Sequence, residues 1–166
     1  MFRRLHNDKG MTLTELVVVM VVLSVLASVV MPTVRVSVKR AKEMELRRDL
    51  MNMRDAIDAY KKYSDEGRIP REAGGTGYPK TLDDLTGQIQ LTNVVAAQPG
   101  QTQAQAPQKI RLLRKIPIDP MTGNADWGKR SNDDDPESTT WGGQDVFDVY
   151  SKSEGTALNG TKYKDW

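Results

Sequence analysis

The side chain whose chemistry stands out in this sequence is Glu15, because it is the only charged residue between Met11 and Met31. A carboxylate among apolar side chains is costly unless it is paired, so an isolated one marks a functional contact. Gly10 directly precedes the apolar run, and a cut after it would create a new α-amino group at Met11, about one helical turn from Glu15. An amine and a carboxylate are natural ion-pair partners there, within one chain or between neighbouring chains. Between chains, such a pair would set the axial register.

Few other side chains suggest chemistry, and several functional classes are not expected. Cysteine is absent, and the only histidine, His6, lies among the first ten residues. The sequence therefore argues against a thiolate metal site, a histidine-ligated zinc and a hydrolase with a histidine base. The formal net charge is +2, without a patch of interleaved basic and aromatic residues, so no nucleic-acid partner is expected. No set of residues suggests catalysis, and we expect that the protein is not an enzyme.

The apolar segment, residues 11–32, has the length of a membrane span. At ~1.5 Å per residue, a helix from Met11 to Met31 is roughly 31 Å long, about the hydrocarbon thickness of a bilayer. The chain as a whole is polar, with a mean hydropathy of −0.56, so this run is a strong local exception. Residues 1–10 form a short basic leader before it. Pro32 lacks an amide hydrogen and is predicted to kink or loosen the helix.

Residues 33–63 are predicted to continue the helix with one apolar face. They contain no glycine or proline, and apolar side chains recur at spacings of four and three residues. Charged residues, Glu43 among them, are expected largely off this stripe. A free coiled-coil dimer is the alternative, but a stripe of about two heptads favours packing on a small domain. The stripe consists of Leu46, Leu50, Met53, Ile57 and Tyr60.

Residues 64–166 are predicted to form a globular domain with short strands. An extended run at 110–118 leads into a turn, and strands are expected around Trp127 and at 145–150, where apolar and polar residues alternate. Residues 88–108 are rich in glutamine, alanine and threonine, and we expect them to form a flexible excursion from this domain.

The segment Lys9-Gly10-Met11-Thr12-Leu13-Thr14-Glu15, followed by the valine-rich run and Pro32, resembles the class III leader of type IV pilins and type II secretion pseudopilins. The resemblance implies cleavage between Gly10 and Met11 by a prepilin peptidase, N-methylation of Met11 by the same enzyme, and a role for Glu15 in assembly. Other stretches resemble the major pseudopilin of type II secretion in particular. These are Tyr78–Leu82, Arg114–Gly123, Asp148–Ser151 and the aromatic ending Asn159–Trp166.

The resemblance to the major pseudopilin implies an α+β, type IV pilin-like fold. A long N-terminal helix, with a membrane half and an amphipathic half, packs on a small antiparallel β-sheet, and a C-terminal loop follows. The implied function is that of a structural subunit of a pseudopilus, which helps to export folded proteins across the outer membrane. The implied partners are further copies of the chain in a helical filament, the prepilin peptidase, minor pseudopilins and an inner-membrane assembly platform.

No cofactor is expected, and calcium is the one open question. The family often binds calcium in its C-terminal loop through several aspartates. Here the loop, residues 152–166, offers only Ser153, Glu154 and Asp165 beyond neutral groups. Calcium prefers six to eight oxygen ligands, several of them carboxylates, so no metal ligands are assigned from the sequence. The acidic run 133–135 is the other candidate source of carboxylates.

The resemblance implies one pass through the bacterial inner membrane, with the C-terminal domain in the periplasm. Counting basic residues on both sides of the span favours the opposite orientation, but this rule is weaker for long domains that cross the membrane. Two other functions stay open. One is a type IV pilin of a surface pilus, a class in which a C-terminal cysteine pair is common; this chain has no cysteine. The other is a membrane-anchored periplasmic binding module, in which Glu15 would be dispensable.

Overall fold

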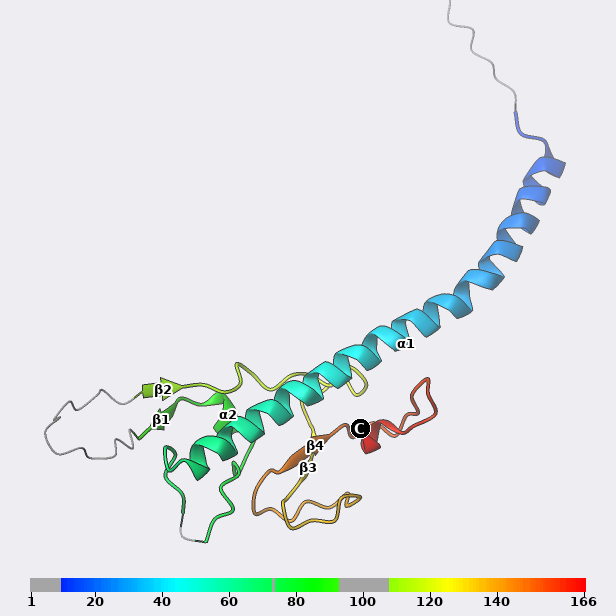
Figure 1. The fold of residues 1–166 in the computed structure, drawn as a ribbon. Coiled ribbons are helices and arrows are strands. Elements are labelled where there is room, and N and C mark those ends of the chain that lie inside the picture. The colour runs from blue at the N-terminus through cyan, green and yellow to red at the C-terminus, as the bar shows by residue number, and fades with distance from the viewer. Residues whose placement is uncertain (1–9, 73, 93–107) are drawn as a thin grey trace, which may run out of the picture. The chain divides into compact units, whose positions relative to one another are not determined.

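The computed structural model of the chain describes residues 10–72, 74–92 and 108–166 (Figure 1). The leader expected at residues 1–10 lies outside the described residues except for Gly10. Most of the excursion expected at residues 88–108 also lies outside them.

The chain divides into two compact units, Met1–Arg40 and Ala41–Trp166, and each is described by itself. One long helix belongs to both, and every other element belongs to the second unit. In chain order the elements are α1 (Leu13–Asp65), α2 (Asp83–Thr86), β1 (Ile89–Leu91), β2 (Gln108–Ile110), β3 (Gly128–Arg130), β4 (Asp148–Tyr150) and the 3-10 helix η1 (Tyr163–Asp165).

In the first unit, α1 begins with a side-chain cap. Thr12 Oγ1 accepts a hydrogen bond from the main-chain N–H of Glu15 at 3.2 Å, and the Thr12 carbonyl accepts one from the N–H of Leu16 at 3.1 Å. Threonine is a favoured capping residue because its hydroxyl satisfies an amide that has no partner inside the helix. The first turn of α1 is therefore fixed by local sequence.

The rest of this unit is an apolar helix whose side chains are exposed. Among the described residues, α1 is the one helix long and apolar enough to cross a membrane, and its most apolar stretch is not buried. The hydroxyls of Ser24 and Ser28 donate to carbonyls of the preceding turn at 2.7 Å, so these two polar groups are satisfied within the helix. The helix continues through Pro32 without a break.

In the second unit, the predicted apolar stripe of α1 is confirmed as one wall of the core. Leu46, Leu50, Met53 and Ile57 are buried, and Tyr60 packs against them. The chain's own domain covers this face, so it is not a free coiled-coil seam. The residues that cover it are Leu82, Leu85, Trp127, Val146, Val149, Ala157 and Tyr163.

The helix ends where the sequence changes to glycine and proline. The N–H of Glu66 donates to the Lys62 carbonyl, and the N–H of Gly67 donates to the Ser64 carbonyl. Gly67 has a φ of 70°, the left-handed conformation that closes many helices and that glycine adopts without steric cost.

The α+β, type IV pilin-like fold is confirmed, but the strands form two small antiparallel sheets instead of one. β1 pairs with β2, with Ile89 opposite Ile110, and β3 pairs with β4, with Gly128 opposite Tyr150. Strands β1 and β2 lie at the two ends of the excursion expected at residues 88–108. The extended run at 110–118 leaves the ladder after Ile110. Further along, Pro117 has no amide hydrogen to donate to a strand.

The strand expected around Trp127 begins one residue later, at Gly128. Trp127 itself belongs to the core. Its ring is buried, and its Nε1 donates to the Pro117 carbonyl at 2.9 Å.

The strand expected at 145–150 is confirmed only for 148–150, and the alternation expected there is wrong. Asp145 and Val146 are both buried, and so are Val149 and Tyr150. Asp145 accepts hydrogen bonds from Ser131 and Asn132, while Val146 enters the core.

Candidate functional site

The bond between Gly10 and Met11 lies just before the helix, in exposed chain without regular secondary structure. Met11 is 62% exposed, and no atom lies within 4 Å of the position of a Cβ at Gly10. α1 begins at Leu13, so the backbone at this bond is outside the intrahelical hydrogen bonding. A protease that must fit an extended backbone into its site can reach this bond without unwinding the helix.

Glu15 lies in the first turn of α1, three residues after the capping Thr12. Within the described part of the chain, its exposed carboxylate forms no ion pair. The expected partner, an amine at Met11, belongs to the preceding turn of chain. The structure thus places Gly10, Met11 and Glu15 together at the start of the helix. It leaves the Glu15 carboxylate open to a partner from the same chain or from another one.

Pro32 lies within α1 in the same unit. Its predicted role in assembly, and the kink expected there, stay predictions.

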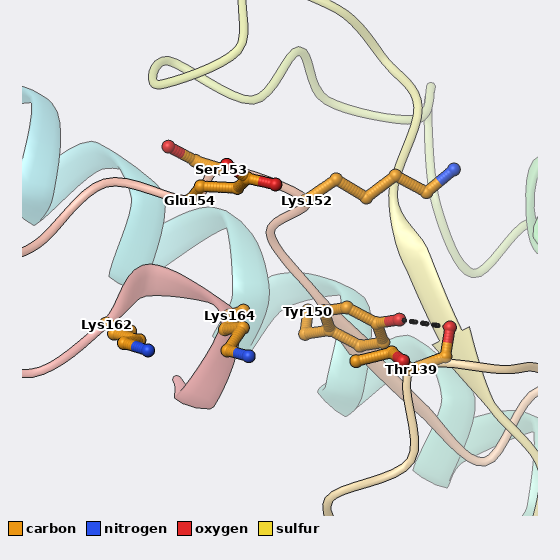
Figure 2. A pocket seen from close by; sticks show the side chains of 7 residues that line it. All are labelled: Thr139, Tyr150, Lys152, Ser153, Glu154, Lys162 and Lys164. Carbon is orange, nitrogen blue, oxygen red and sulfur yellow. Dashed lines mark hydrogen bonds between the residues drawn. The ribbon is translucent and has the colours of Figure 1, made fainter.

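The residues that the sequence offered for calcium are not gathered into one site. Ser153 and Glu154 line a cavity of about 620 Å³ that also contains the side chains of Lys152, Lys162 and Lys164 (Figure 2). Asp165 is not part of its lining. Across residues 10–72, 74–92 and 108–166, no three acidic or histidine side chains lie close enough together to hold a metal ion.

The acidic run 133–135 organises its own loop. Asp134 Oδ2 accepts the main-chain N–H groups of Ser131 at 2.7 Å and Gly142 at 3.0 Å. These hydrogen bonds favour the charged form and lower the pKa of the Asp134 carboxyl below its usual value. Asp133 accepts a hydrogen bond from the Asn132 amide. In the described structure, Asp133 and Asp134 therefore take part in the hydrogen bonding of their own loop.

A buried carboxylate that the sequence did not single out lies on α1. Glu43 was expected largely off the apolar stripe, but it is only 9% exposed. One oxygen, Oε1, accepts hydrogen bonds from the main-chain N–H of Leu158 and the hydroxyl of Tyr163, both at 2.9 Å. Its position three residues before Leu46 was the available signal, since residues three apart share a helix face.

Tyr163 is expected to be the last tyrosine to ionise in an alkaline titration. Burial, the hydrogen bond to Glu43 and the charge of Glu43 raise the pKa of its phenol to about 12. A raised pKa means that folding favours the protonated phenol. Its contribution to stability is therefore complete below about pH 10, the usual tyrosine pKa, and is lost as the pH rises towards 12.

Ultraviolet absorbance of tyrosinate measures this titration. In Tyr163→Phe the step at highest pH should disappear while the earlier steps keep their midpoints. A titration in which all tyrosines of the wild-type protein ionise together near pH 10 would contradict the buried contact with Glu43.

Comparison with known proteins finds a match to a family motif and similarity to two curated proteins. Residues 5–31 match the family described as the prokaryotic N-terminal methylation motif. A curated relative, type II secretion system core protein G of Klebsiella pneumoniae, is 28% identical over 116 residues, which cover 70% of this chain and 71% of that protein.

Core protein G of Pectobacterium carotovorum subsp. carotovorum is 34% identical over 70 residues, 42% of this chain and 44% of that protein. No solved structure gives a significant match. The chain is thus similar to the prokaryotic N-terminal methylation motif at the start of α1 and, over longer stretches, to two type II secretion system core proteins G.

Proposed function

We propose that the protein is a structural subunit of a pseudopilus that helps to export folded proteins across the outer membrane. The observation that carries this proposal is the methylation motif at residues 5–31, joined to a helix that is apolar and exposed in its first unit. The second unit has a closed core of its own. Such a chain can leave the lipid for a helical filament, because lipid tails and a core of packed helices are similarly apolar.

In this proposal, the precursor is held in the inner membrane with residues 1–10 in the cytoplasm and residues 64–166 in the periplasm. A prepilin peptidase cuts between Gly10 and Met11 and methylates the new amine. The assembly platform and minor pseudopilins then build copies of the chain into a filament, in which Glu15 neutralises a terminal amine. The chain is the substrate of an enzyme, and the role requires no catalysis by its own residues.

Intact mass of the purified protein tests the processing step. The protein made together with a prepilin peptidase should lack residues 1–10 and carry one additional methyl group. The protein made without the peptidase should keep its full mass. Gly10→Leu, made with the peptidase, is the matched variant and should stay uncleaved, because a large side chain replaces the small residue next to the bond. An uncleaved wild-type chain in the presence of the peptidase would overturn the proposal.

The alternative functions predict different results. A surface pilin would be processed in the same way, but its deletion would remove surface filaments and leave secretion intact. A membrane-anchored binding module would work without processing and without Glu15.

A further inference from the structure

The C-terminal loop, residues 152–166, needs something that holds it to the rest of the domain, since it contains no strand of the two sheets. The resemblance to the major pseudopilin implies a calcium ion for this purpose. The donor set of this chain does not fit that ion. Calcium takes six to eight oxygens with several carboxylates, whereas one cavity beside the loop contains one carboxylate, from Glu154 (Figure 2), and a second contains two, from Glu137 and Asp165, among two arginines and two lysines.

The charges around the first of these cavities also oppose a cation. The lysines at positions 152, 162 and 164 all line it, and Figure 2 shows the nitrogen of Lys152 pointing away from the other two. Only one of them is balanced by an ion pair in the described chain, where Lys152 Nζ lies 2.6 Å from Asp126 Oδ1. Like charges near a binding position raise the free energy of the bound ion, and a single carboxylate does not offset them.

Protein groups hold the middle of the loop instead. Glu43 on α1 accepts one hydrogen bond from the Leu158 main chain and one from the Tyr163 hydroxyl, each at 2.9 Å. The two donors come from either side of the turn at Gly160, whose φ is 87°. Hydrogen bonds to a carboxylate are stronger than those between neutral groups, and the Glu43 and Tyr163 side chains are both buried. One carboxylate thus fastens both sides of the turn to the helix.

Two arginines on the same face of α1 hold the end of the loop. The guanidinium group of Arg47 lies 3.9 Å from the centre of the Trp166 ring. Arg54 Nη2 donates to the Trp166 carbonyl at 2.8 Å and to the Val149 carbonyl at 3.1 Å, while Arg54 Nε pairs with Asp148 Oδ1 at 2.6 Å. Residues at spacings of four and seven lie on one side of a helix, so Glu43, Arg47 and Arg54 act on the loop together.

The loop is also cross-linked within itself by neutral contacts. The N–H of Ala157 donates to the Thr161 carbonyl at 2.8 Å, and Trp166 Nε1 donates to Thr161 Oγ1 at 2.7 Å. The rings of Tyr163 and Trp166 meet edge to face with centroids 5.2 Å apart. The turn therefore has a defined shape that requires no bound ion.

We propose that Glu43, Arg47 and Arg54 fasten the C-terminal loop to α1 in place of calcium, so that the folding of this domain is independent of calcium. Glu43 is the central group, because removing its carboxylate leaves a buried hydroxyl and a main-chain amide without an acceptor. This inference concerns the domain alone and does not rest on the proposed assembly into filaments.

Limited proteolysis and thermal unfolding of the full chain in detergent test the proposal. In the wild-type protein, the rate of cleavage within residues 152–166 should change less than about twofold between millimolar calcium and excess chelator. Glu43→Leu should raise that rate by about tenfold or more in both conditions, because the buried Tyr163 hydroxyl and the Leu158 main-chain N–H both lose their acceptor. The matched control is Glu45→Leu, an exposed position on the same helix, which should leave the rate unchanged.

A milder variant keeps the test decisive if Glu43→Leu does not fold. Tyr163→Phe removes one of the two donors and should raise the cleavage rate by a smaller factor, again without rescue by calcium. Hydrogen exchange of the wild-type Leu158 amide should be slow with chelator present. The proposal is overturned if chelator speeds cleavage or lowers the melting temperature of the wild-type protein. It is also overturned if both Glu43→Leu and Tyr163→Phe leave the loop as protected as before.

Discussion

A protein carrying Glu15→Val should insert into the membrane and be cleaved normally, yet enter filaments at least about a hundredfold less than the wild-type protein. Valine makes the span more apolar, so insertion does not suffer. What is lost is the one carboxylate of the run, which the described structure leaves exposed and without an ion pair at the start of α1. Breaking a desolvated ion pair by removing one partner costs ~3–5 kcal/mol, and about 1.4 kcal/mol corresponds to tenfold.

Three measurements on the same cells separate the steps. Intact mass reports cleavage and methylation, membrane fractionation reports insertion, and the sheared filament fraction together with the secreted protein reports assembly. Ser24→Ala is the matched control, because the Ser24 hydroxyl bonds only to the Met20 carbonyl of its own helix. Assembly and secretion at wild-type levels in Glu15→Val would favour a membrane-anchored binding module.

Gly128→Ala should destabilise the globular domain by about 3 kcal/mol, the upper part of the range for overpacking a well-filled site. Gly128 lies opposite Tyr150 in the β3–β4 ladder, and a Cβ placed on it would lie 2.3 Å from ring atoms of Tyr150. The ring is not free to move away. Its hydroxyl donates to the Thr139 carbonyl at 3.2 Å, and the Arg130 guanidinium lies 4.3 Å from the ring centre.

Denaturant unfolding of the full chain, followed by tryptophan fluorescence, measures this effect, because Trp127 is buried next to Gly128. Gly87→Ala is the control: a Cβ there meets nothing closer than 3.7 Å, and its φ of −67° suits any residue. It should change stability by less than about 0.5 kcal/mol. A second change, Tyr150→Leu, should recover part of the loss in Gly128→Ala, whereas additive losses would contradict the steric explanation.

The parts of the fold that were predictable are those encoded by local pattern. The stripe Leu46–Leu50–Met53–Ile57 repeats with the period of a helix, and it is the core face of α1. The leader motif is also contiguous in sequence. The strands were harder to locate, because each is only three residues long and so offers almost no alternation to read.

The role of Glu43 was not predictable, because its partners are 115 and 120 residues away in the chain. A charged residue beside an apolar stripe is usually solvated, and only the fold brings the loop over it. The other buried carboxylates follow the same rule. Asp119 accepts the Ser151 hydroxyl at 2.5 Å and the Met121 N–H at 2.7 Å. Asp119, like Glu43, is thus an acceptor for the chain's own N–H and hydroxyl groups.

The hydroxyl of Thr12 lies on the mature side of the proposed cut, so the helix starts at the same place before and after processing. Cleavage therefore requires no refolding of the span, and what changes is charge. The N-terminus of a helix carries a partial positive charge of about half an elementary unit, and a new ammonium group beside it is electrostatically unfavourable. Glu15 in the first turn offsets both charges. The residue proposed to pair with a terminal amine in the filament would thus also offset the positive charge of a newly cut helix end in an apolar environment.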